Sequence, residues 1–217
     1  MLKDFILGGQ DGIVNVLGIT LGMAGATQDA RIVIIAGLAA LFAESISMAA
    51  VAYTSTKAEH DFYYGELGKE KRRLKIQPSL EKKEIEQVYY QKGFRGRLLK
   101  QIVQKITSDD KMWLDTLMRE SNMVHNGYSP LKSAFVVGCA STLGSLIPVL
   151  PFFFLTLAHA LVFSVVISAL SLFLAGAFEG KITLRSWFNE GFKLMVIGLL
   201  AAFIGFMIGK WLGVNVV

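Results

Sequence analysis

Long apolar runs, interrupted by one large polar segment, dominate the pattern of the chain. Runs long enough to cross the hydrocarbon core of a bilayer as helices are predicted at 5–26, 32–56, 131–150, 156–178 and 188–211. Only a few residues connect the first two runs, so we expect these helices to form a tight hairpin. The pattern predicts an all-α, polytopic membrane protein with five transmembrane helices.

The polar segment between the second and third runs reads as a small helical unit. We predict helices at 79–90, 96–106 and 109–123, after a break at Pro78 and with Ser79 as an N-cap. Its expected core is formed by Ile85, Val88, Leu98, Ile102, Trp113, Leu114 and Leu117. We therefore divide the chain into transmembrane helices one and two (1–56), a polar helical insert (57–128), and transmembrane helices three to five (129–217).

One helix is expected to leave the membrane and continue into water, because nothing in 36–73 forces it to stop before Pro78. At 100° per residue, four side chains fall within roughly 40° of one another, with Glu44 close to that stripe: Met48, Glu59, Glu66 and Glu70. The stripe from Met48 to Glu70 would span about 33 Å. It suggests a track for a metal cation; the alternative is the solvated side of a helix.

Composition and charge narrow the class of protein. The chain is 53% hydrophobic, and its single cysteine, Cys139, permits no internal disulfide. Of its 22 Lys and Arg residues, 16 lie in 57–132. The positive-inside rule then places this segment, the N-terminus and the loop with Lys181 and Arg185 in the cytosol, and it explains the net charge without nucleic acid. We find no phosphate-binding loop, zinc-finger spacing or Glu-x-x-His pair, so an enzyme is the least expected class.

Ionisable groups inside the predicted membrane helices are the first candidates for chemistry, because a charge at the bilayer centre costs at least about 2.5–3.5 kcal/mol. Asp11 and Asn15 begin a polar face, although Asp11 could instead cap backbone near the interface. Glu44 and Met48 lie one turn apart in the second helix. Carboxylate with thioether suits a first-row transition ion better than Mg²⁺ or Ca²⁺. Met48 alone would be read as packing.

The polar segment offers a second group of candidate metal ligands. They are carboxylates and one thioether that could converge from three helices: Glu66, Glu70, Glu81, Glu84, Met118 and Glu120. Glu81 and Glu84 stand at i, i+3 and share a helix face. The alternative is that they form ordinary solvated faces of helices.

Three stretches carry a resemblance that covers nearly the whole chain. They are DGIVNVLGITLGMAGA in the first run, AGLAALFAESISMAAVAYTSTKAEHDFY in the second and SAFVVGCASTLGSLIPVLPFFF in the third. With these motifs, and with a charged insert after a helical hairpin, the chain resembles the vacuolar iron transporter family. The resemblance implies proton-coupled export of Fe²⁺, sometimes Mn²⁺, from the cytosol. It also implies a homodimer with the ion path between protomers, and an insert that binds metal in the cytosol.

The resemblance assigns roles to individual residues. Asp11 and Met48 match the residues taken to line the ion path, whereas Ala40 stands where the family usually has a glutamate. Glu44, one turn further along, is expected to substitute for it. In the insert, four residues match the family's metal ligands: Glu70, Glu81, Glu84 and Met118.

Three positions depart from the family pattern. Arg73 and Ser121 stand where glutamates are expected, and Leu117 where a methionine is expected, although Glu120 lies beside Ser121. The resemblance therefore implies an insert that binds fewer ions, binds them more weakly, or prefers another metal.

Together these features predict a transporter that exports a divalent transition metal in exchange for protons. The metal we expect first is Fe²⁺. No cofactor is expected to be permanently bound, since the metal is cargo. The protein would lie in the plasma membrane of a prokaryote, or in a vacuolar or other organellar membrane of a eukaryote, with its N-terminus in the cytosol. Two alternatives stay open: a transporter of Mn²⁺ or another divalent metal, and a membrane-bound metal sensor or scaffold whose basic insert binds anionic lipid or a partner protein.

Overall fold

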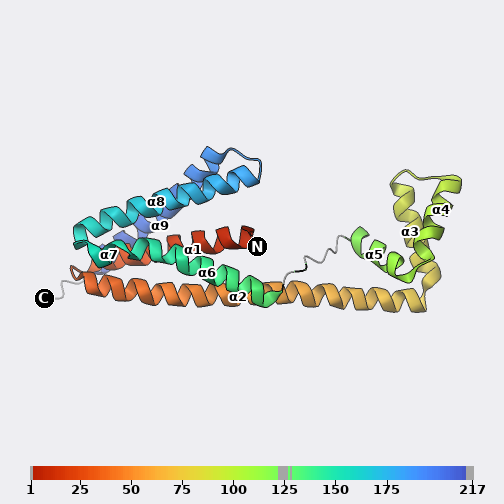
Figure 1. The fold of residues 1–217 in the computed structure, drawn as a ribbon, viewed down its shortest axis with the longest axis horizontal. Coiled ribbons are helices and arrows are strands. Elements are labelled where there is room, and N and C mark those ends of the chain that lie inside the picture. Colours follow the sequence, from red (N-terminus) through yellow and green to blue (C-terminus); the bar gives the residue numbers. More distant parts are fainter. Residues whose placement is uncertain (1, 122–126, 128, 214–217) are drawn as a thin grey trace. The chain divides into compact units, whose positions relative to one another are not determined.

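The computed structural model describes residues 2–121, 127 and 129–213, and every regular element in these ranges is a helix. Five helices are long and apolar enough to cross a membrane, as Figure 1 traces along the chain: α1 (Leu2–Ala26), α2 (Ala30–Ile76), α6 (Pro130–Val149), α8 (Leu157–Ile182) and α9 (Trp187–Leu212). The others are α3 (Pro78–Gln91), α4 (Gly96–Thr107), α5 (Asp110–Glu120) and the one-turn α7 (Pro151–Phe154). The protein is an all-helical, multi-pass membrane protein.

The chain divides into two compact units. We call residues 1–54 with 130–217 the membrane unit, and residues 55–129 the insert unit. The helix predicted over 36–73 is confirmed as continuous, because α2 runs unbroken from Ala30 to Ile76 and contributes residues to both units. Asp29 caps its start by accepting a hydrogen bond from the Arg31 backbone N–H at 2.8 Å, which satisfies one of the free donors of the first turn.

Within the membrane unit, α1 packs closely along both α6 and α9, and α8 packs along α9 (Figure 1). Glycines make these contacts close. A Cβ added to Gly12 of α1 would lie 2.5 Å from the Ser141 carbonyl oxygen of α6, and one added to Gly22 would lie 3.0 Å from the Gly205 oxygen of α9. In hydrocarbon, where burial of apolar surface drives no association, small residues let helix backbones gain packing contact. These glycines hold α1, α6 and α9 together as one frame.

The membrane half of α2 is held more loosely than the other membrane helices. It buries a narrow stripe at i, i+4, i+8 and i+12, namely Val33, Gly37, Leu41 and Ser45. The contacts are made through side chains: the position of a Cβ on Gly37 lies 2.9 Å from the Thr20 methyl group. The rest of this helical surface is available to lipid or to another protein surface.

The end of α8 differs from the prediction, which stopped the helix at residue 178. The helix continues to Ile182 and closes with a bond from the Arg185 N–H to the Gly180 carbonyl at 2.8 Å. That six-to-one bond is the Schellman motif, whose C′ position favours glycine. Leu184 occupies it with φ of 57° and is 96% exposed. No glycine stands at this position to mark the end of the helix.

The insert unit has its own small core, built from Ile85, Leu99, Val103, Ile106, Trp113 and Leu117. Leu98, predicted to belong to it, is instead 54% exposed. The prediction was wrong because α4 turns the spacing of Leu99, Val103 and Ile106 inward, which leaves the neighbouring side chain about 100° away and outside. Ser79 is not the N-cap of α3 either: Gln77 holds that position, and Pro78 begins the helix with its fixed φ.

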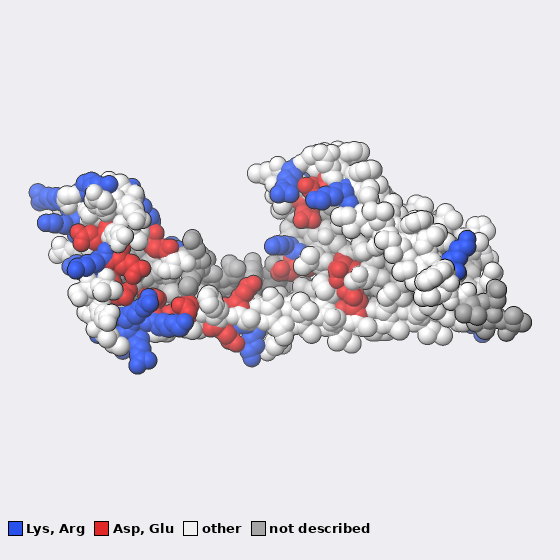
Figure 2. Space-filling view, turned by 180° about the vertical axis from the view of Figure 1, so that it is seen from behind, with Lys and Arg blue, Asp and Glu red and all other residues white. Residues whose placement is uncertain are grey.

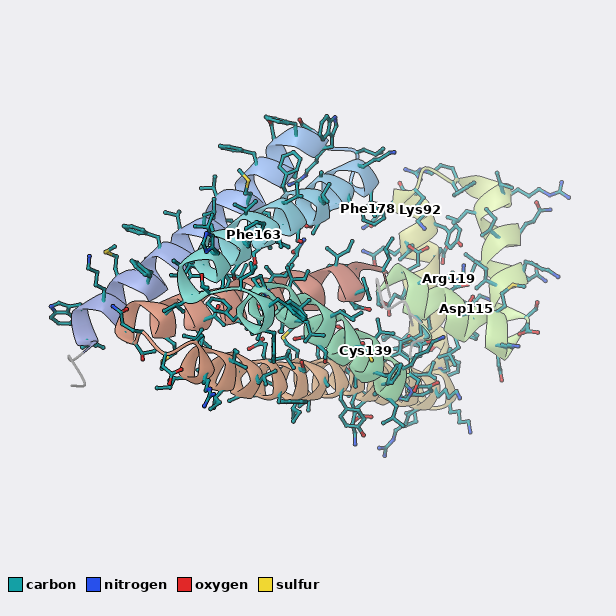
Figure 3. All side chains as sticks on the ribbon, turned by 60° about the vertical axis from the view of Figure 1, so that its left-hand side comes forward. Lys92, Asp115, Arg119, Cys139, Phe163 and Phe178 are labelled. Carbon is teal, nitrogen blue, oxygen red and sulfur yellow. The ribbon has the colours of Figure 1, made fainter. Side chains whose placement is uncertain are left out.

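Charge is unevenly distributed over the surface. In the space-filling view, the visible Lys and Arg side chains gather on the insert unit and near the ends of the membrane helices, and acidic side chains also appear within the otherwise uncharged surface of the membrane unit (Figure 2). Large apolar side chains cover the rest of the membrane unit; Phe163 and Phe178 of α8, labelled in Figure 3, are about half exposed. An apolar surface of this kind is suited to contact with lipid.

Candidate functional site

Two carboxyl groups meet inside the membrane unit. Glu44 of α2 lies within hydrogen-bonding distance of the Asp11 carboxyl and close to the Asn15 side chain, both on α1. Asp11 and Asn15 are one helical turn apart, so they present both groups to the same side of α1. We call Asp11 and Glu44 the carboxyl pair. At this distance two carboxylates repel each other unless a proton or a cation lies between them.

The helix geometry around the carboxyl pair adds one soft ligand. Met48 stands one turn beyond Glu44 on the same face of α2 and is partly buried. Carboxylate, amide and thioether groups are therefore available along a short stretch of the membrane unit. Oxygen with sulfur is a ligand set of intermediate softness, which suits divalent first-row ions.

Glu81 is the most unusual acidic residue of the insert unit. Its side chain is only 2% exposed, and its Oε2 atom has no hydrogen-bond partner. Burial, and next the charges of Glu70 and Glu84, raise the pKa of Glu81, while Arg73 opposes the shift. A buried carboxyl with a free acceptor near two further acids favours uptake of a positive charge, either a proton or a metal ion.

The remaining insert candidates are occupied by ion pairs or packed in the core. Glu66 pairs with Lys69, Glu70 with Arg73 and Glu120 with Lys92, while Met118 is buried and Glu84 is exposed. Over the described part of the chain, no three His, Cys, Asp or Glu side chains lie close enough together to hold a metal ion. The insert ligands therefore stay a prediction: Glu81 lies within range of the charges of Glu70 and Glu84, but the three do not enclose an ion site.

An open cleft lies beside these residues in the insert unit. Its walls come from α2, from α5 and from the α5 cap, and include Tyr63, Leu67, Asp109, Met112, Asp115 and Met118. Asp115 is paired with Arg119 one turn along α5, at 3.0 Å, and both are labelled in Figure 3. Met118, the one thioether predicted as an insert ligand, lines the cleft but is buried.

The residues that depart from the family pattern have structural roles here. Arg73 holds the Glu70 carboxylate at 3.0 Å. Leu117 is buried in the insert core, and Ser121 ends α5 as its C-cap. An arginine at position 73 therefore competes with any metal for Glu70, whereas position 117 contributes to packing.

Sequence reasoning missed one residue of the membrane site. Thr142 of α6 is hydrogen-bonded to Ser45, the residue next to Glu44, with 2.9 Å between the two hydroxyl oxygens. Nothing in the local pattern identifies Thr142, because it stands among other small residues of a membrane helix. Only the tertiary structure identifies this residue, because α6 passes beside α2 at the level of Ser45.

The fold and the site define a class: a multi-pass membrane protein with a polar, carboxyl-bearing contact between two membrane helices. Residues 2–210 match the family model described as the VIT family. The chain is 30% identical over 213 residues to vacuolar iron transporter 1 of Arabidopsis thaliana, covering 97% of this chain and 85% of that protein. It is 27% identical over 224 residues to Protein CCC1 of Saccharomyces cerevisiae, covering 98% of this chain and 69% of that protein. The chain belongs to the VIT family.

Proposed function

We propose that the protein exports divalent iron from the cytosol across a membrane in exchange for protons. The contact of Glu44 with Asp11 and Asn15 carries this proposal. A hydrocarbon environment makes isolated charges costly, so carboxyl groups that persist there and face each other are best explained by a cation that visits them. The similarity to vacuolar iron transporter 1 of Arabidopsis thaliana supports iron as the cargo.

The exchange follows from charge balance at the carboxyl pair. With both groups ionised, the pair carries two negative charges and can bind one divalent cation. With both protonated it is neutral, so the ion leaves and the two groups hydrogen-bond to each other. Two unit charges about 4 Å apart repel by about 4 kcal/mol at an effective dielectric constant of 20, so an empty, fully ionised pair is disfavoured. Ion and protons therefore compete for the same groups, which is the basis of antiport.

Each residue has a proposed role in this scheme. Asp11 and Glu44 are the groups that bind the ion and the protons, Asn15 supplies an amide oxygen, and Met48 supplies a thioether on the path. In the insert unit, Glu81 is the central ligand, with Glu66, Glu70, Glu84, Met118 and Glu120 as the surrounding set that collects the ion. Glu66 and Glu70 stand on α2, the helix that also carries Glu44.

A second copy of the chain is part of the proposal. Asn15 is exposed in the single protomer even though it contacts Glu44 in the membrane unit. An amide that faces lipid leaves its hydrogen bonds unmade, so another surface should cover it. A homodimer formed along α1 and the loosely packed half of α2 would cover Asn15 and place the ion path between the two protomers. In this arrangement the insert unit and the N-terminus are in the cytosol, as the distribution of Lys and Arg indicates.

A specific observation favours a second cargo. Arg73 occupies the Glu70 carboxylate, so the insert has one free ligand fewer than the family pattern implies. The free ligands that are left in the insert are mostly carboxylates, a ligand type that suits Mn²⁺, so we keep Mn²⁺ as the second candidate cargo. Competition of each metal against Fe²⁺ uptake distinguishes the two cargoes.

The test is ion flux in proteoliposomes with an imposed pH gradient, under anaerobic conditions so that iron stays divalent. Wild-type protein should move Fe²⁺ and carry protons in the opposite direction, and both fluxes should stop in Asp11→Asn and in Glu44→Gln. Glu86→Gln, an exposed carboxylate of α3 outside the site, is the matched control and should transport normally. Flux that is unchanged in both site variants would overturn the proposed mechanism. Metal binding without any flux would favour the sensor or scaffold reading.

A further inference from the structure

Loose packing of α2 raises the question of what keeps Glu44 opposite Asp11. The described side-chain contacts between α2 and α6 include one hydrogen bond, between Ser45 and Thr142. Ser45 is buried and adjacent to Glu44, while Thr142 is half-buried. We propose that this hydrogen bond is a clasp that positions the Glu44 carboxyl for ion binding. The inference rests on the proposed function of the carboxyl pair and adds two positioning residues to it.

The hydroxyl chemistry makes the contact directional. The Thr142 Oγ1 atom lies 2.9 Å from the Ser45 Oγ atom and 2.8 Å from the Gly138 carbonyl oxygen one turn back on α6. A hydroxyl has one proton and two lone pairs. When Thr142 donates to Gly138, it accepts from Ser45, and both protons are used inside the helix contact. Ser45, which is buried, therefore satisfies its donor across the helix interface.

The clasp acts on Asp11 through the α1–α6 contact. Asp11 lies between Gly9 and Gly12, and α6 touches α1 at both: Gly144 of α6 packs directly on the Gly9 backbone, and Gly12 packs on the Ser141 carbonyl. Such backbone contacts fix α6 relative to Asp11. Because Thr142 lies between Ser141 and Gly144, it is fixed by the same contact.

A closed circuit of contacts follows, from Asp11 through α1 and α6 to Thr142, then through Ser45 to Glu44. These contacts hold α1 and α2 together at the carboxyl pair. When both carboxyl groups are ionised and no metal is present, their repulsion pushes α1 and α2 apart. The hydrogen bond opposes that separation at the adjacent residue. The next contact along the same helices is Ala49 of α2 against Gly138 of α6, where a Cβ added to Gly138 would lie 3.0 Å from the Ala49 Cβ. This close approach keeps the two helices near enough for the clasp to form.

Kinetics of Fe²⁺ transport test the clasp. Thr142→Val keeps the shape and removes the hydroxyl, and Ser45→Ala removes the partner; each should raise the KM for Fe²⁺ about threefold to tenfold, the range set by a membrane hydrogen bond. Thr142→Ser keeps the hydroxyl and should restore the wild-type KM. The Ser45→Ala, Thr142→Val double variant should be no worse than either single variant, since both remove the same bond. Thr54→Val is the control, because the Thr54 hydroxyl donates within its own helix, to the carbonyl oxygens of Ala50 and Val51.

A second readout does not depend on transport. In a Cys139→Ser background, Asp11→Cys with Glu44→Cys places two thiols at the carboxyl pair, and the rate of disulfide formation within one protomer reports how often they meet. Thr142→Val should slow this rate, and Thr142→Ser should not. Equal rates in all three proteins, or a fall in maximal flux with KM unchanged, would overturn the clasp. If the disulfide rates follow the expected order but the wild-type protein moves no Fe²⁺, the clasp stands and only the transport proposal is overturned.

Discussion

The Glu44 carboxyl of α2 lies within hydrogen-bonding distance of the Asp11 carboxyl of α1, inside the part of the protein that crosses the membrane. The two residues are 33 positions apart in sequence and meet because a short turn at 27–29 folds α2 back along α1. This one contact joins the chemistry of the site to the fold.

Asn15 should strengthen ion binding at the carboxyl pair. Its amide contacts Glu44, and loss of a polar partner leaves that carboxyl with fewer groups to hold it. Asn15→Leu should raise the KM for Fe²⁺ by about tenfold, the effect of roughly 1.4 kcal/mol, with little change in maximal flux. Ile19→Leu, an exposed position one turn further along α1, is the control. A wild-type KM in Asn15→Leu would remove the amide from the ion site.

Gly12 should be required for the α1–α6 contact. A Cβ at this position would lie 2.5 Å from the Ser141 carbonyl oxygen and 2.7 Å from the Ser145 hydroxyl oxygen, so the helices must separate to admit it. Gly12→Ala should lower stability by about 1–3 kcal/mol, as overpacking does. Gly68→Ala, in a helical position with open space around it, should instead raise stability by about 0.5–1 kcal/mol. Thermal unfolding in detergent compares the two; equal effects would contradict the close helix contact.

Changing Leu184 to glycine should relieve backbone strain at the end of α8. Its φ of 57° lies in the left-handed region, which costs a non-glycine residue about 1–2 kcal/mol. Leu184→Gly should therefore stabilise the protein by about 1 kcal/mol in detergent. Leu174→Gly, at an exposed position inside the same helix α8, should destabilise it by a similar amount. A loss of stability on Leu184→Gly would show that the leucine makes a contact that outweighs the strain.

The insert unit should lose stability as pH rises above the ordinary range of a glutamate. Burial and the neighbouring acids raise the pKa of Glu81 above its ordinary value of 4.5. The folded state then holds a proton that the unfolded state has released, so this contribution is full below pH 4.5 and is lost as pH rises through the folded pKa. Glu81→Gln should flatten the dependence, and at neutral pH without metal it should stabilise the unit.

Trp113 provides the measurement for that prediction, because it is buried in the insert core. With Trp187→Phe and Trp211→Phe, its fluorescence follows denaturant unfolding of the insert unit in the full-length chain. Chelator removes metal from the samples. Identical slopes of stability against pH in the parent and in Glu81→Gln would contradict the assignment to Glu81.

Arg73 should weaken metal binding by the insert, because it pairs with Glu70 at 3.0 Å. Arg73→Ala frees that carboxylate and removes a positive charge, so the affinity of the full-length protein for Mn²⁺ or Fe²⁺ should rise about threefold to tenfold. Arg72→Ala, the exposed neighbouring position on α2, changes the net charge equally and is the control. Calorimetry compares them; equal gains would mean that only net charge matters.

Helix lengths and types follow from the sequence because they depend on local pattern. The apolar runs predict the membrane helices, and Pro78 predicts where α2 must end, as it does at Ile76. Side-chain direction within the insert was harder to predict: Leu98 and Leu99 are adjacent and equally apolar, and only the packing of α4 on Ile85 and Trp113 decides which one is buried. The end of α8 was missed because Leu184 adopts a conformation that the local sequence disfavours.

What the sequence determined by itself was the inventory of the site: an acid and an amide on the first helix, an acid and a thioether on the second. These residues stand out because charge in hydrocarbon is costly wherever it occurs. Only the tertiary structure decided that Glu44 meets Asp11 and that Ser45 is held by Thr142. The reason is that the rotation of each helix about its axis, and its distance from its neighbours, depend on the glycine contacts of α1, α6 and α9. These contacts join residues more than a hundred positions apart in the sequence.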